Sequence, residues 1–221
     1  MEVQRNPRVE RTRAALIAAG QRLFSKRPVD AVTVDDIVQA AGVGKGSFYN
    51  HFVDREALGH AVCADIRAGI EKACGRCNAQ IEDPARRITR AKCTYLRFAL
   101  DEPERAGVMI HLYGGHTSVS APLNRGLLDD ISRGLETGRF IVPTSEAGVL
   151  YVLGIAQISL VRLVQEPTLS FAVSLAQQMC TLLLRGLGLP AAEADLIAAQ
   201  ASDEIIRRGA FAKRKGSTSS S

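Results

Sequence analysis

Residues 33–52 read TVDDIVQAAGVGKGSFYNHF, and this stretch decides the fold. Thr33, followed three residues later by Asp36, is typical of a helix start, and apolar residues then recur at helical spacing. Gly42 can adopt a left-handed backbone angle, which ends this helix and turns the chain. A second short helix follows. Two short helices joined by a glycine turn form the layout of a helix-turn-helix, whose second helix enters the major groove of DNA.

The flanking segments can complete a small bundle. Residues 8–25 carry apolar side chains on one face and arginines on another, and a further helix is expected to begin after Phe52 with Asp54 as its cap. Phe48 and Phe52 are four residues apart and are expected to face inward. We therefore predict an all-α chain that begins with a three-helix DNA-binding bundle.

The same motifs, in this order, resemble the N-terminal domain of the TetR family of transcriptional regulators. The resemblance covers roughly residues 10–60, and it departs from the family at Arg27, Pro28 and Val29, where members usually carry a glycine and then an aromatic residue. It rests on Leu16, Ile17, Ala18, Ala19, Phe24, Thr33, Val34, Ile37, Ala41, Gly42, Val43, Gly46, Phe48, Tyr49, His51, Phe52, Arg55 and Leu58. The resemblance implies a larger helical domain behind the bundle, which binds a ligand and forms a dimer.

Beyond residue 60 the hydrophobic pattern is helical throughout. The expected helices are 54–74, 84–101, 103–113, 122–137, 145–165, 168–185 and 190–208, with a loop at 114–120. This organisation predicts a helix-turn-helix DNA-binding domain over residues 1–53 and a helical effector-binding and dimerisation domain over 54–208. A basic, serine-rich tail over 209–221 is expected to be disordered.

The helices over 145–165 and 168–185 are apolar on nearly every side, so they need cover on more than one face. A second copy of the chain would supply it, with two helices from each subunit forming a four-helix bundle about a two-fold axis. The alternative is that both helices fill the core of a monomer. A dimer would hold two reading helices one DNA turn apart, which predicts a palindromic operator and an effector that acts by changing their spacing.

Nine residues are the predicted DNA contacts. We expect Lys45 and Ser47, with Asn50, to reach base edges, and Tyr49 and His51 to reach phosphate oxygens. Three of them have a structural alternative: Tyr49 could be a half-buried core aromatic, His51 a helix C-terminal cap and Lys45 an ordinary solvated residue. The full set is Thr33, Gly44, Lys45, Gly46, Ser47, Tyr49, Asn50, His51 and Arg55, in which Arg55 and the helix start at Thr33 are also assigned to phosphates.

The effector site is the less specific prediction. In this family the C-terminal domain usually encloses a cavity, and polar-aromatic residues in this chain could line one. The predicted set is Tyr95, Phe98, Met109, His111, Tyr113, His116 and Tyr151, each of which could equally belong to the core. Apolar walls with few polar groups favour a small hydrophobic or amphiphilic ligand.

Two other function classes remain open. Cys74 and Cys77 could make the protein a thiol- or metal-responsive regulator, although a zinc site needs two further ligands. The chain could also be a helical enzyme or binding module that retains a non-functional DNA-reading domain. The Gly42-x-Gly44-x-Gly46 run lacks the preceding strand of a dinucleotide site and the serine or threonine of a phosphate loop.

Composition limits the remaining classes. The net charge of +5 permits a polyanionic partner without requiring one, and no catalytic motif is present, so we predict no enzyme activity, no cofactor and no metal. The five cysteines form an odd set that fits reduced thiols. We expect a cytoplasmic protein, because no signal peptide is visible and the most apolar stretch, 147–161, is short for a membrane span.

Overall fold

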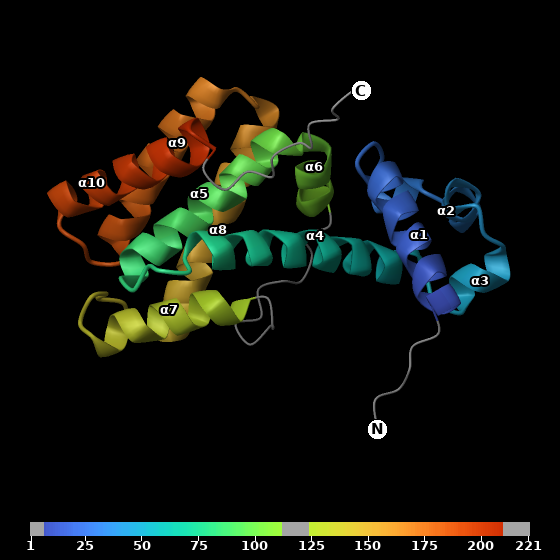
Figure 1. The fold of residues 1–221 in the computed structure, drawn as a ribbon, viewed down its shortest axis with the longest axis horizontal. Helices are drawn as coiled ribbons and strands as arrows, with labels where there is room; N and C mark the ends of the chain where they lie inside the picture. The colour runs from blue at the N-terminus through green and yellow to red at the C-terminus, as the bar shows by residue number, and fades with distance from the viewer. Residues whose placement is uncertain (1–6, 112–123, 210–221) are drawn as a thin grey trace, which may run out of the picture. The chain divides into compact units, whose positions relative to one another are not determined.

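The computed structural model describes residues 7–111 and 124–209, and every regular element within them is helical, which confirms the all-α class. The last helix was expected to run to 208, but it passes into a π-helical turn, Ser202–Arg207. The predicted loop 114–120 lies outside the described residues. The helices in Figure 1 are α1 (Pro7–Phe24), α2 (Val34–Ala41), α3 (Lys45–Tyr49), α4 (Arg55–Cys77), α5 (Pro84–Asp101), α6 (Pro103–His111), α7 (Arg125–Glu136), α8 (Ser145–Gln165), α9 (Leu169–Gly186) and α10 (Ala191–Ala201).

The chain divides into two compact units. The first comprises the chain up to Ala68 together with a segment that begins at Glu104, and the second comprises Gly69–Pro103 and the remaining residues. The division falls inside α4, whereas the domain boundary predicted after residue 53 lies just before this helix begins.

In the first unit, α1 packs against α2 and against the start of α4. A Cβ atom added at Gly20 would lie 3.0 Å from Val62 Cγ2 and 3.2 Å from Leu58 Cδ2, so glycine allows α1 to approach α4 closely. Leu16 and Phe24 on α1 are fully buried, as the helical spacing of the sequence predicts.

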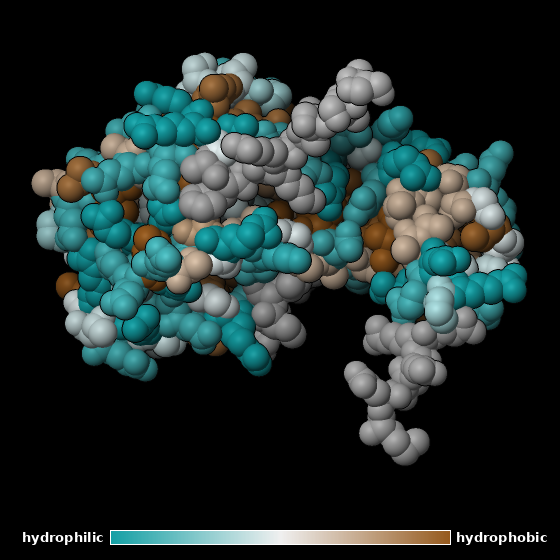
Figure 2. Space-filling view, in the orientation of Figure 1, coloured by the Kyte–Doolittle hydropathy of each residue, from teal (hydrophilic) through white to brown (hydrophobic). Residues whose placement is uncertain are grey.

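In the second unit, α5 packs against α7, α8 and α9, and α10 packs against both α9 and α5. Figure 1 shows α5, α9 and α10 as neighbouring helices, and the face of this unit seen in Figure 2 is mostly hydrophilic. The buried apolar cluster consists of Ala85, Ile88, Ile131, Phe140, Val149, Val152, Leu183, Leu184, Leu187, Leu189, Ala194 and Ile197.

Helix α8 leaves much of its apolar surface uncovered by its own chain. The most apolar 18-residue stretch of this 21-residue helix has a mean hydropathy of 1.9, and 33% of that stretch is buried. By length and composition alone, the helix could cross a membrane. The expectation that this stretch is short for a span was wrong, because the helix extends beyond 147–161 at both ends and tolerates Glu146 and Arg162 near its termini.

The small residues of α8 have different roles. A Cβ atom at Gly148 would lie 2.8 Å from Ile131 Cγ2, so this glycine serves close packing between α8 and α7 within the subunit. A Cβ atom at Gly154 would meet nothing within 4 Å. Leu150 and Ile158 flank Gly154 along the helix and are 42% and 57% exposed.

Candidate functional site

The start of α2 is held by a reciprocal cap. Thr33 Oγ1 accepts a hydrogen bond from the backbone N–H of Asp36 at 3.1 Å, and Asp36 Oδ2 accepts one from the backbone N–H of Thr33 at 3.1 Å. The bond from the Thr33 backbone lowers the pKa of the Asp36 carboxyl group. This arrangement confirms the helix start that the sequence predicts.

The turn between α2 and α3 depends on glycine. Gly42 has φ 67° and ψ 34°, in the left-handed region, and its N–H donates back to carbonyls at the end of α2. Gly44 and Gly46 are exposed, and a Cβ atom at either would meet nothing within 4 Å. Packing within the subunit therefore does not require these two glycines, and their backbone is open to an external group.

Helix α3 is anchored from one side by Phe48. This side chain is fully buried, and its ring centroid lies 5.9 Å from that of Phe52. Tyr49, the next residue, meets the Phe48 ring edge-on at 5.3 Å and is 54% exposed. The buried ring fixes the orientation of α3, and this orientation places Tyr49 on the outer surface.

The other predicted contact residues of α3 differ in exposure. Lys45 and Asn50 are exposed, whereas Ser47 and His51 are half-buried. Lys45 Nζ lies 2.9 Å from Asp35 Oδ1, and the hydrogen bond with Asp35 raises the pKa of Lys45. Both partners are solvent-exposed, so this ion pair contributes little to folding and leaves Lys45 free to exchange partners.

Arg55 makes internal contacts that the sequence did not reveal. Its Nη1 donates to the backbone carbonyl of Asp30 at 2.9 Å and lies 3.4 Å from that of Val32, and its Nε pairs with Glu56 at 2.8 Å. The guanidinium group thus ties the first turn of α4 to the short 3-10 turn that precedes α2. That turn, Val29–Ala31, begins at the last of the three residues at which the sequence departs from the family pattern.

The predicted effector residues lie on separate elements. Tyr95 and Phe98 are half-buried on α5, and Met109 is buried on α6. Tyr151 on α8 is also half-buried, and its hydroxyl group donates to the carbonyl of Leu182 on α9 at 3.1 Å. That bond gives Tyr151 a role in joining α8 to α9. The side chain of His111, and Tyr113 and His116 altogether, lie outside the described residues.

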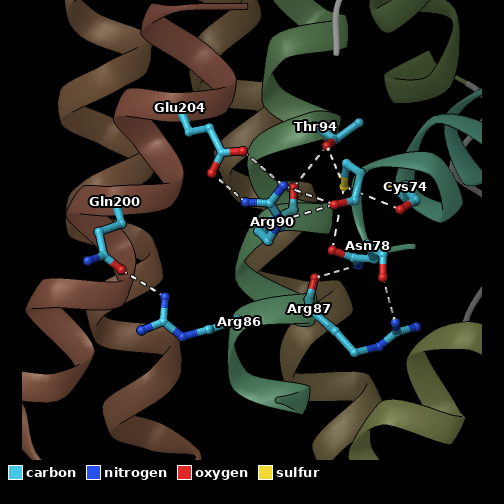
Figure 3. Close-up of polar contacts among 9 residues, drawn as sticks. Cys74, Asn78, Arg86, Arg87, Arg90, Thr94, Gln200 and Glu204 are labelled. Carbon is cyan, nitrogen blue, oxygen red and sulfur yellow. Dashed lines mark hydrogen bonds and ion pairs between the residues drawn. The ribbon is translucent and has the colours of Figure 1, made fainter. Parts of the chain in front are cut away.

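Two of the hollows in the described part of the second unit have no predicted effector residue in their walls. One, of about 360 Å³, lies between α5 and the π-helical turn, where Arg86, Arg90, Glu204 and Arg208 reach its wall. Figure 3 shows that these polar groups are largely paired with one another: Arg86 with Gln200, and Arg90 with Glu204. The other is a shallow depression over α9 and the start of α10.

The Cys74–Cys77 pair lies at the end of α4, beside Arg90 and Thr94 (Figure 3). The Cys77 thiol donates to the Cys74 carbonyl at 3.2 Å. Burial raises the pKa of both thiols, so both are protonated and unreactive at neutral pH. All five thiols are free, and no group of three or more possible metal ligands occurs among the described residues. These surroundings give no support to a thiol- or metal-responsive mechanism.

Lys92 is a polar residue that the sequence reasoning missed. It lies on α5 and is 3% exposed. A signal was available, because Ile88, Lys92, Leu96 and Ala99 follow one another at spacings of four, four and three, and this spacing places the lysine on the buried stripe of its helix.

Comparison with protein families gives two matches. The family described as "Bacterial regulatory proteins, tetR family" matches residues 16–62, and the "Tetracyclin repressor-like, C-terminal domain" matches residues 83–200. The HTH-type transcriptional repressor DhaR of Mycobacterium sp. (strain GP1) is 38% identical over 27% of this chain and 30% of its own. TtgR of Pseudomonas putida, an HTH-type transcriptional regulator, is 42% identical over 24% of this chain and 25% of its own. The chain thus matches less than a third of the length of these relatives.

Solved structures resemble the chain over most of its length. RolR in complex with resorcinol has a TM-score of 0.64 at 26% identity and covers 89% of this chain and 97% of its own. The fatty acid degradation regulator FadR of Bacillus halodurans has a TM-score of 0.65 at 17% identity, with coverages of 85% and 100%, and this likeness concerns the fold alone. The matched families and these named relatives are transcription regulators rather than enzymes.

Proposed function

Because the chain belongs to the tetR family of bacterial regulatory proteins and is a DNA-binding transcriptional regulator, we propose that it is a homodimeric repressor of a palindromic operator. A small molecule releases it from DNA. Residues 1–53 read the operator and residues 54–208 bind the effector and form the dimer, with 209–221 as a basic, serine-rich tail. A regulator of this kind acts in the cytoplasm, where bacterial DNA lies.

The observation that carries the proposal is the division of α3 into a buried and an exposed side. Phe48 is fully buried, while Lys45 and Tyr49 are exposed beside the open backbone of Gly44 and Gly46. One face of α3 holds the helix in the bundle. The other face carries polar groups and glycines with open space around them, so this face can approach a DNA groove closely.

The contacts divide by chemistry. Lys45, Ser47 and Asn50 read base edges, and Lys45 gives up its exposed pairing with Asp35 when it does so. Tyr49 and His51 donate to phosphate oxygens. Thr33 and the first N–H groups of α2 contact a further phosphate. Arg55 contacts the DNA backbone only through those guanidinium N–H groups that are not already bonded to the Asp30 carbonyl and to Glu56.

The dimer forms through α8 and α9. Leu150 and Ile158 on α8 and Leu182 on α9 are 42%, 57% and 53% exposed, so two helices that pack against each other both present large aliphatic side chains at the surface. In a dimer with a two-fold axis beside this face, both copies of these three side chains are buried in the interface. The same interface keeps the two reading helices at a fixed separation.

The effector is a small hydrophobic or amphiphilic molecule. Support comes from RolR, which is 26% identical and was solved with resorcinol, a small phenol. The predicted lining residues, Tyr95, Phe98, Met109, His111, Tyr113, His116 and Tyr151, stay proposals. Tyr151 enters such a site only if ligand binding replaces its bond to the carbonyl of Leu182.

Selection of bound DNA from a random pool, followed by mobility shifts at stated salt, tests the proposal. We expect a two-fold symmetric sequence to be enriched. Lys45→Ala and Tyr49→Ala should each weaken binding at least about 30-fold, because a lost groove or phosphate contact costs about 1 kcal/mol or more and occurs in both half-sites. Lys72→Ala, an exposed lysine on α4, removes the same charge and should bind like the parent.

Three results would contradict the proposal. Enrichment of no sequence by a folded dimer would favour a helical binding module with a non-functional DNA-reading domain. Parental binding by both α3 variants would remove these residues from the groove. DNA binding that responds to oxidant or chelator, but to no organic molecule, would favour control through Cys74 and Cys77.

A further inference from the structure

The ammonium group of Lys92 is buried with one partner. Its Nζ lies 2.8 Å from Ser159 Oγ on α8. The Ser159 hydroxyl donates its own proton to the carbonyl of Ile155 at 2.6 Å, so its oxygen accepts from Lys92. Within residues 7–111 and 124–209, no other oxygen accepts a hydrogen bond from this ammonium group and no carboxylate pairs with it. Two of its three N–H donors are therefore unused.

Such a group is costly to the fold. An isolated ammonium group loses its hydration on burial, and the penalty remains several kcal/mol after the protein relaxes. Burial accordingly lowers the pKa of Lys92. The neighbouring positions on the same stripe of α5 are Ile88 and Leu96, so an apolar residue would fit the helix pattern better. Stability alone gives no reason for a lysine here.

We propose that Lys92 recognises the acidic group of the effector, a small organic acid whose carboxylate or phenolate oxygen docks on the ammonium group beside Ser159. This inference rests on the proposed ligand-released regulator and names the class of ligand. The anion takes up the two unused N–H donors and supplies the missing counter-charge. The apolar body of the acid lies among the aliphatic side chains of α5, α8 and α9.

The burial of Lys92 also links recognition to a change of shape. The side chain is enclosed by its neighbours on α8 and α9, so an acid can reach it only when α5 and α8 move apart locally. A ligand that binds only this separated arrangement shifts the population of protein molecules toward it. Release from DNA requires this difference in the affinity of the ligand for the two arrangements.

An internal counter-ion is the main competing explanation. The thiols of Cys93 on α5 and Cys180 on α9 lie near Lys92 and are fully buried. The interaction between the two thiols raises the pKa of Cys93 and, together with the charge of Lys92, lowers the pKa of Cys180. A Cys180 thiolate would neutralise Lys92 without any ligand.

Matched pairs of acids and alcohols test the proposal on the full chain. The probes are benzoate against benzyl alcohol and octanoate against octanol, measured by thermal shift and titration calorimetry. We expect the acids to bind the parent at least about tenfold more tightly than the alcohols, because a buried donor left unpaired rejects a ligand that lacks the anion. Lys92→Met should lose this preference and should be no less stable than the parent in the absence of probe.

The alternative results are equally definite. Equal binding of acid and alcohol, no binding of either acid, an acid preference that survives in Lys92→Met, or a Lys92→Met protein that is markedly less stable would each overturn the assignment. An ultraviolet thiolate absorption in the parent at neutral pH, lost in Cys180→Ala, would do the same. Lys92→Met should still bind selected operator DNA like the parent. Failure of the parent itself to bind DNA would count against the proposed function and not against this site.

Discussion

Truncation of Ile158 to alanine tests the proposed dimer face quantitatively. Ile158 lies on α8 with 57% of its surface exposed, so its loss leaves the core of the subunit largely unchanged. Complete burial of an isoleucine side chain contributes about 1.5–3 kcal/mol, and the exposed part therefore about 1 kcal/mol. A two-fold interface contains the residue twice, so the dimer loses about 2 kcal/mol and its dissociation constant rises about 30-fold.

Sedimentation over a dilution series measures this constant. Leu196→Ala is the matched control, because Leu196 is a similarly sized residue on α10, is 53% exposed and lies outside α8 and α9. We expect the control to dimerise like the parent and both variants to retain the parental circular dichroism spectrum. An unchanged constant for Ile158→Ala, or equal weakening by Leu196→Ala, would refute the assignment of the dimer face to α8.

Three further expectations concern the cap and the thiols. Thr33→Ala should lower the free energy of unfolding by about 1 kcal/mol in denaturant titrations, whereas Thr33→Ser, which keeps the capping oxygen, should not. The folded-state pKa of Asp36 is lowered, so the contribution of its carboxylate is complete above the ordinary aspartate pKa and is lost as the pH falls through the lowered value. Asp36→Asn should therefore flatten the acid limb of the stability profile, and a slope identical to that of the parent would contradict this account. Burial raises the pKa of Cys63 to about 11 and also raises the pKa values of Cys74 and Cys77. None of these three thiols should therefore react with a disulfide reagent at neutral pH until the protein is denatured. Rapid reaction of the native protein would reopen the hypothesis of a thiol-responsive regulator.

Local spacing in the sequence was sufficient to predict the helix-turn-helix. The Thr33–Asp36 cap and the left-handed Gly42 each depend on residues within a few positions, so their residue types alone predict their geometry. The inward Phe48 and outward Tyr49 follow from helical periodicity. The apolar character of α8 and α9 likewise indicated the need for cover on more than one side.

Tertiary structure decided the roles that depend on partners distant in the chain. Arg55 donates to a carbonyl 25 residues away, Tyr151 to one 31 residues away, and Lys92 to a hydroxyl group 67 residues away. Helical spacing tells which side of a helix a residue occupies, but the element packed against that side, and the atoms it offers, depend on how the whole chain folds. For this reason the sequence identified Lys45, Tyr49 and Asn50 as residues that face outward from α3. The single hydrogen-bond partner of Lys92 became apparent only when α8 was in place beside α5.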